Sequence, residues 1–137
     1  MIQVSATHEM HIDCEDDIIK VRRRVRDIAV LRKFDSFATA AITTATSELA
    51  RNALVHGGTG TARIEEVSDG FRFGLRIVFH DVGPGIADIP RALAGGYTTA
   101  GSMGLGLSGS RRLVDEFELE CAPGAGTKVT VTKWKRF

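Results

Sequence analysis

The chain has 137 residues, of which 43% are hydrophobic and 26% are charged, and its formal net charge is +1. This composition excludes a disordered chain, and the near-neutral charge gives no reason to expect nucleic-acid binding. The length predicts a single domain over residues 1–137. Charged residues interrupt the N-terminal segment and no apolar run could span a bilayer, so we expect neither a signal peptide nor a membrane partner.

The two cysteines, Cys14 and Cys121, form neither a CxxC pair nor a metal-ligand spacing. We therefore expect buried or incidental thiols in a reducing compartment, which predicts a cytoplasmic location.

The first half of the chain predicts one strand and two helices. Residues 2–13 alternate loosely between apolar and polar, as in a half-buried strand. Asp16 and Asp17 then open a helix whose apolar residues recur at helical spacing, while its four arginines form either a solvated face or a docking face for an acidic partner. The apolar positions of this helix are Ile18, Val21, Val25, Ile28 and Ala29. A second helix is expected over 36–55, ended by Gly57-Gly58.

The second half predicts four strands and one helix. Asp69-Gly70 is a strong hairpin signal between strands at 61–68 and 71–81. A long loop over 83–103, with a short helical turn near 89–93, precedes a helix over 105–116 and strands at 117–122 and 127–135. The element order predicts an α/β (α+β) two-layer sandwich, with helices on one face of a mixed, mostly antiparallel sheet.

Four clusters with candidate chemistry follow one another along the chain. The first pairs Glu48 with Asn52, which share a helix face because they are four residues apart. The amide oxygen could ligate Mg²⁺ while the carboxylate orients or deprotonates an attacking hydroxyl. A Glu/Asn pair on a solvated helix face is the alternative interpretation.

The second cluster is Asp81, Gly83 and Gly85, at the end of an apolar strand. The carboxylate can accept a hydrogen bond from an exocyclic amine such as N6 of adenine, and the glycines allow a planar base to approach the backbone. A simple turn would look the same. A dinucleotide-binding motif would need Gly or Ala at position 88, which is Asp88, and a helix that Pro84 and Pro90 disfavour.

The third cluster, Gly101, Gly104 and Gly106, falls where a helix begins, and bare backbone N–H groups at a helix N-terminus bind phosphate. No Lys-Ser/Thr follows, so this is not a Walker motif, and a flexible hinge is the alternative. The fourth is Gly126-Thr127, where the hydroxyl of Thr127 could contact the base beside Asp81 through water. Here an ordinary strand threonine is the alternative.

In this order, the four clusters resemble the boxes of the Bergerat-fold ATPase and kinase superfamily, the GHKL or HATPase_c domain of gyrase, Hsp90, histidine kinases and MutL. Within it the chain is most similar to the RsbT-type switch kinases of partner-switching systems and the stressosome. The segments Ser47–Ala53, Gly95–Thr99 and Gly104–Phe117 carry that likeness.

The resemblance implies an ATP- and Mg²⁺-dependent serine/threonine-protein kinase for signal transduction that phosphorylates a STAS-domain protein and, once released, activates a phosphatase or other regulator. It makes Glu48 the catalytic base and Asn52 the metal ligand. It assigns nucleotide binding to Asn52, Asp81, Gly83, Gly85, Ile86, Gly101, Ser102, Met103, Gly104, Leu105, Gly106 and Thr127.

Two other functions stay open. One is an anti-sigma factor that sequesters a sigma factor, and the other is an ATP-binding module without transferase activity. Related anti-sigma kinases place an arginine before the second glycine box, where this chain has Ala100. The charge of the terminal phosphate would then be neutralised by Mg²⁺, backbone amides, or a basic residue such as Arg51, Arg91 or Arg111.

Overall fold

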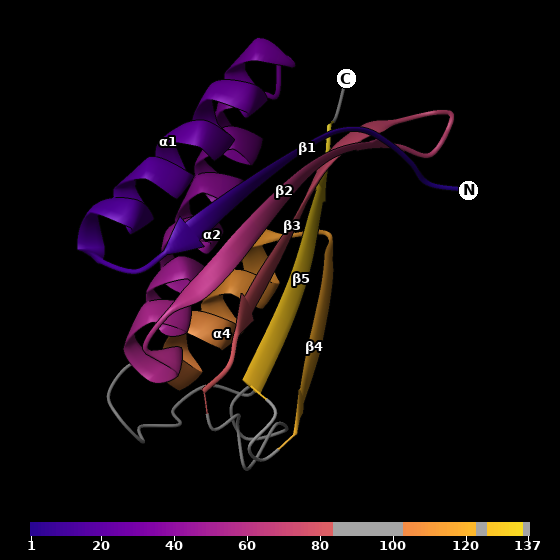
Figure 1. Cartoon of the computed structure of the whole chain (residues 1–137). Helices are drawn as coiled ribbons and strands as arrows, with labels where there is room; N and C mark the ends of the chain where they lie inside the picture. Colours follow the sequence, from indigo (N-terminus) through magenta and orange to yellow (C-terminus); the bar gives the residue numbers. More distant parts are fainter. Residues whose placement is uncertain (84–102, 123–125, 136–137) are drawn as a thin grey trace.

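A computed structural model describes residues 1–83, 103–122 and 126–135. Within these residues one sheet of five strands, in the order β1-β2-β3-β5-β4, carries three helices on one of its faces (Figure 1). The elements are β1 (Gln3–Ile12), α1 (Glu15–Leu31), α2 (Ser36–Gly57), β2 (Gly60–Ser68), β3 (Phe73–Asp81), α4 (Met103–Leu113), β4 (Glu116–Ala122) and β5 (Gly126–Trp134). The two-layer α+β sandwich is therefore confirmed.

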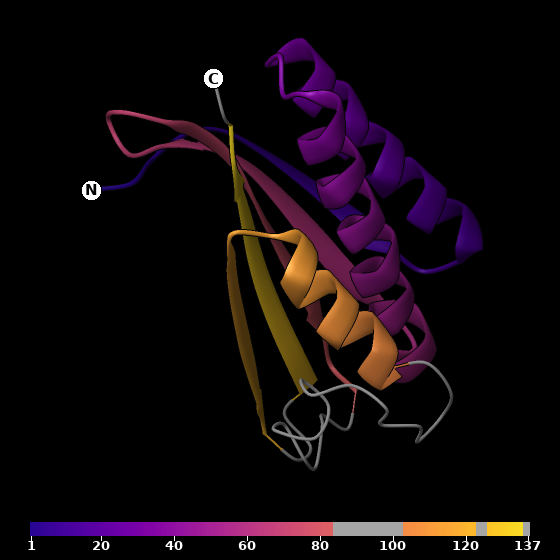
Figure 2. The same ribbon diagram turned by 180° about the vertical axis from the view of Figure 1, so that it is seen from behind.

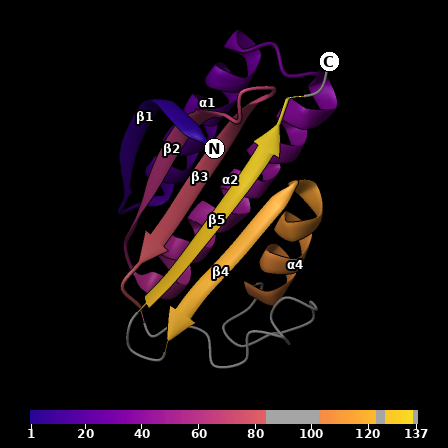
Figure 3. The same ribbon diagram turned by 90° about the vertical axis from the view of Figure 1, so that its right-hand side faces the viewer.

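Every strand pairing in the sheet is antiparallel, so the sheet is not mixed. The last strand, β5, lies between β3 and the edge strand β4 (Figure 3). This order aligns Asp81 of β3 with Thr127 of β5 on one side and with Gly60 of β2 on the other. The ends of three neighbouring strands thus meet at one edge of the sheet, beside the C-terminal end of α2.

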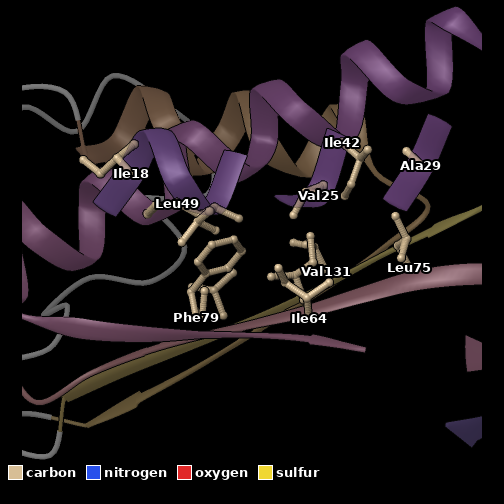
Figure 4. Packing of buried hydrophobic residues seen from close by; sticks show 14 of the residues in the cluster. Ile18, Val25, Ala29, Ile42, Leu49, Ile64, Leu75, Phe79 and Val131 are labelled. Atoms are coloured by element: carbon tan, nitrogen blue, oxygen red, sulfur yellow. The ribbon is translucent and has the colours of Figure 1, made fainter. Parts of the chain in front are cut away.

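The core lies between the helices and the inner face of the sheet (Figure 4). Ile64, Phe79 and Val131 project from three neighbouring strands toward Val25 of α1 and Leu49 of α2. All five apolar positions that the sequence predicted for the first helix are buried. Burial of the apolar residues of α1 and α2 against the sheet drives this packing.

Several predicted boundaries differ from the structure, and hydrogen bonds account for two of them, one between distant segments and one within a turn. The third helix was expected to reach residue 116 but ends at Leu113, because the Asp115 N–H donates to the carbonyl of Thr132 and begins the pairing of β4 with β5. The second hairpin strand starts at Phe73 rather than 71. The Asp69 carboxylate accepts from the N–H groups of Phe71 and Arg72, which holds both in the turn.

Candidate nucleotide site

The helix α2 carries the first candidate pair. It is well fixed at both ends: the Asp35 side chain accepts from the Ala38 N–H at 2.7 Å, and the C-cap Gly58 adopts φ 80°. Its inner stripe is buried against the sheet. Glu48 lies half-buried on the border of that stripe, and Asn52, one turn later, is only 8% exposed. Both side chains therefore lie on the same side of α2.

The amide nitrogen of Asn52 is buried and has no hydrogen-bond partner within the described residues. Buried polar groups in proteins are nearly always paired, so this amide is open to a water molecule or a bound group. Rotation of the side-chain amide exchanges the positions of its oxygen and nitrogen. The amide can therefore either ligate a metal ion through its oxygen or donate a hydrogen bond from its nitrogen to a phosphate-bound water. The donor set of an amide oxygen beside a carboxylate fits Mg²⁺.

Asp81 ends β3 and is 7% exposed. Burial raises the pKa of its carboxyl group, while the Gly83 N–H, which donates to Oδ1 at 2.9 Å, and the nearby His80 act in the opposite direction. The carboxyl group is thus oriented by the backbone two residues on. The backbone of Thr127 also hydrogen-bonds the carboxyl group, and a buried carboxylate oriented in this way is a specific acceptor for an amino group.

Three glycines enclose Asp81 so closely that no larger residue fits. A Cβ on Gly57, the last residue of α2, would lie 2.4 Å from the Cβ of Asp81 and 2.5 Å from its Cγ. One on Gly83 would lie 2.7 Å from the Cα of Gly57, and one on Gly126 would lie 2.0 Å from the carbonyl oxygen of Asp81. The end of α2 therefore sits directly against the carboxylate.

Sequence reasoning missed the role of Gly57, which we interpreted only as a helix end. The available signal was its spacing from Asn52: the two residues are five apart on one helix, which is about 7.5 Å along the axis, so Gly57 had to lie near the predicted metal ligand. His56, beside Gly57, is half-buried, and burial lowers its pKa while the Asp81 carboxylate opposes the shift. The imidazole of His56 therefore lies near the carboxylate, at the border of the candidate site.

The structure places Thr127 next to Asp81, since the two are paired across β3 and β5, and Thr127 is buried. Of the second glycine box, Gly104 and Gly106 lie in the first turn of α4, which packs beside α2 (Figure 2). Backbone N–H groups of a first helical turn have no intrahelical partner. Met103 and Leu105 belong to the same turn. The predicted residues Gly85, Ile86, Gly101 and Ser102 lie outside the described residues, as do the predicted turn at 89–93 and most of the predicted loop over 83–103.

The structure places two of the three basic residues considered for the terminal phosphate. Nη1 of Arg51 lies 3.0 Å from each carboxylate oxygen of Glu15, at the start of α1. Arg111 lies in the last turn of α4, at the opposite end from the glycines. Arg91 lies outside the described residues. In the part of the chain that the structure covers, no helix is both long and apolar enough to cross a membrane.

The chain is also similar to known proteins. Residues 37–136 match the family model of histidine kinase-, DNA gyrase B- and HSP90-like ATPases. The chain is 42% identical over 127 residues to the serine/threonine-protein kinase RsbT of Bacillus subtilis, covering 93% of this chain and 96% of that protein. It is 34% identical over 99 residues to an anti-sigma F factor of Thermoanaerobacter, covering 68% of each.

Solved structures show the same fold. The RsbU and RsbW domains of a Mycobacterium tuberculosis protein superpose with a TM-score of 0.64 at 21% identity, covering 95% of this chain and 33% of that one. A histidine kinase domain of the Erythrobacter litoralis EL346 blue-light activated histidine kinase gives a TM-score of 0.51 at 21% identity, over 86% of this chain and 59% of that one.

Proposed function

The chain belongs to the family of histidine kinase-, DNA gyrase B- and HSP90-like ATPases, and on that premise we propose that residues 1–137 form a serine/threonine-protein kinase of a partner-switching module. One observation carries the proposal: α2 presents the pair Glu48 and Asn52, and the same helix ends with Gly57 packed on the buried Asp81. The residues that we propose as base, metal ligand and adenine acceptor thus lie on two adjoining elements.

The adenine ring would bind at Asp81. The carboxylate would accept from the N6 amino group, and because Gly57 and Gly83 lack side chains, the end of α2 and the chain after β3 pack directly against it. Thr127, beside Asp81 in the sheet, would join the contact through water. The amides of Met103, Gly104, Leu105 and Gly106 at the start of α4 would receive the phosphates. We assign Gly85, Ile86, Gly101 and Ser102 to the same nucleotide.

Asn52 would hold Mg²⁺ through its amide oxygen, and the ion, when bound, neutralises phosphate charge. Glu48 would accept the proton of a serine or threonine hydroxyl. The hydroxyl oxygen then bonds to the γ-phosphorus as the bond to the β–γ bridging oxygen breaks, and ADP leaves. General-base assistance of this kind contributes about 10²- to 10⁴-fold in rate.

The substrate we propose is a small STAS-domain protein, with release from it freeing the kinase to act on a downstream phosphatase. The similarity to RsbT over 93% of the chain supports this assignment. The test is transfer of label from [γ-³²P]ATP to purified STAS-domain proteins of the same genome, followed by phosphoamino-acid analysis. Label on serine or threonine is expected, and absence of transfer to every such protein by a chain that binds ATP would refute the proposal.

The second candidate is an anti-sigma factor, favoured by the 34% identity to the anti-sigma F factor. An affinity-tagged chain recovered with a sigma factor, in the presence of ATP, would favour this function. Recovery with a STAS-domain protein or a phosphatase instead would favour the switch kinase.

A further inference from the structure

The solvent-facing stripe of α2 is apolar over the first half of the helix. Phe37, Ala40, Ala41 and Thr44 recur at helical spacing and share one face. Phe37 is 88% exposed, although an aromatic ring of this size gains more than most side chains from burial. The small residues that follow it leave the helix backbone open to close approach by another element.

This stripe forms one wall of a groove of about 500 Å³ between the first turns of α2 and the end of α4. In Figure 2, α4 lies along the flank of α2 and ends halfway up that helix. Leu113 of α4 and Lys133 of β5 line the groove on the other side. Asp35 and Arg112 also line the groove.

Asp35, Arg112 and Lys133 are the charged residues that line the groove. Arg112 is exposed, and within the described residues it forms no ion pair. By contrast, Asp35 is engaged in capping α2, and Lys133 lies 3.7 Å from the carboxylate of Asp115. A matching surface would therefore carry an apolar side chain for the groove, flanked by a carboxylate for Arg112.

The same face of α2 continues to the proposed base. Glu48 follows Thr44 by one turn, about 6 Å along the helix axis. On the C-terminal side of Glu48 lies the candidate nucleotide site, and on the α1 side lies the ion pair of Arg51 with Glu15. A protein that presents a hydroxyl to Glu48 can extend along this face toward the start of α2, where the groove lies.

We propose that this groove docks the protein that receives the phosphoryl group, with Phe37 as the apolar anchor and Arg112 as the charge that orients it. The proposal rests on the function proposed for Glu48. The acceptor protein should then carry an apolar side chain flanked by acidic residues. This surface should lie about 16 Å from the reacting hydroxyl, because eleven residues of helix separate Phe37 from Glu48.

The test compares Phe37→Ala with Phe71→Ala, using as acceptor the STAS-domain protein that the wild-type chain phosphorylates. Phe71 is 94% exposed at the tip of the β2–β3 hairpin, so both variants remove the same exposed ring. We expect Phe37→Ala to raise the KM for the acceptor by at least about tenfold, as for a central aromatic anchor, with kcat at saturating acceptor and the KM for ATP unchanged. Phe71→Ala should leave all three constants unchanged.

Charge reversal provides an independent arm. Arg112→Glu should raise the KM for the acceptor at low ionic strength, and the rise should shrink as salt increases, because rim charges act through screened attraction. Lys20→Glu on α1, another exposed cation, should have no such effect. An unchanged KM in both Phe37→Ala and Arg112→Glu would overturn the docking surface.

Two further results would also overturn it, each in a distinguishable way. If sedimentation shows that the wild-type chain alone is a dimer and Phe37→Ala is a monomer, the groove joins two copies of the chain. If the wild-type chain itself phosphorylates no STAS-domain protein, the proposed function fails and the docking surface fails with it. Transfer by the wild-type chain that Phe37→Ala does not weaken removes only the docking surface.

Discussion

Replacing Gly57 with alanine would test how closely the end of α2 controls Asp81. On helix propensity alone this change is favourable, because alanine in a helix is more stable than glycine by up to about 1 kcal/mol. The new Cβ, however, would lie 2.4 Å from the Cβ of Asp81, 2.5 Å from its Cγ and 2.8 Å from Oδ1. Atoms cannot remain at these separations, so either the carboxyl group or the helix end must move.

Relief of such overpacking costs roughly 1–3 kcal/mol. If Asp81 moves, the hydrogen bond from the adenine amino group to its carboxylate is lost, and a hydrogen bond to a charged group contributes about 1.5–3 kcal/mol. We therefore expect Gly57→Ala to weaken Mg-ATP binding by roughly tenfold to a hundredfold, since each 1.4 kcal/mol is about a factor of ten.

Isothermal titration of the folded variant with Mg-ATP measures this directly. Gly109→Ala is the matched control: this helical glycine of α4 has no atom within 4 Å of its added Cβ among the described residues. It should keep wild-type affinity and gain stability. If folded Gly57→Ala binds Mg-ATP with wild-type affinity, the placement of the adenine ring against Asp81 is refuted.

Three further predictions follow from the same geometry. Asp81→Asn should weaken Mg-ATP binding more than tenfold in a titration, because the amide can present a donor where adenine needs an acceptor. Because the pKa of Asp81 is raised in the folded protein, ionisation of this carboxyl group lowers the free energy of unfolding as pH rises above about 3.8. Urea unfolding should therefore show that the stability of Asp81→Asn rises relative to that of the wild type between this pH and pH 7. Amide exchange at Met103–Gly106 should slow on adding Mg-ATP, and exchange in the Asp69-Gly70 turn should not.

Much of the fold follows from patterns within a few residues. Apolar spacing predicted the buried face of α1, and Gly57-Gly58 marked the end of α2. The Asp69-Gly70 turn was predicted from its residue types, and Gly70 does adopt φ 93°. These features depend on local backbone preferences, which a single sequence carries.

The parts that failed or stayed open depend on contacts between distant segments. The insertion of β5 between β3 and β4 has no local signature, yet it decides that Thr127 lies beside Asp81. The early end of α4 depends on the hydrogen bond between Asp115 and Thr132. The packing of Gly57 on Asp81 joins residues 24 apart, which no periodicity relates.

The most direct test of the proposed kinase site measures ATP binding and phosphotransfer side by side in Glu48→Ala and Asn52→Ala. Glu48 should act only on the acceptor, so its variant is expected to bind Mg-ATP with nearly unchanged affinity while transfer falls by about 10²- to 10⁴-fold. Asn52→Ala should lose both, because it removes a metal ligand. Transfer at the wild-type rate by Glu48→Ala would contradict the assignment of the base and with it the account of the site.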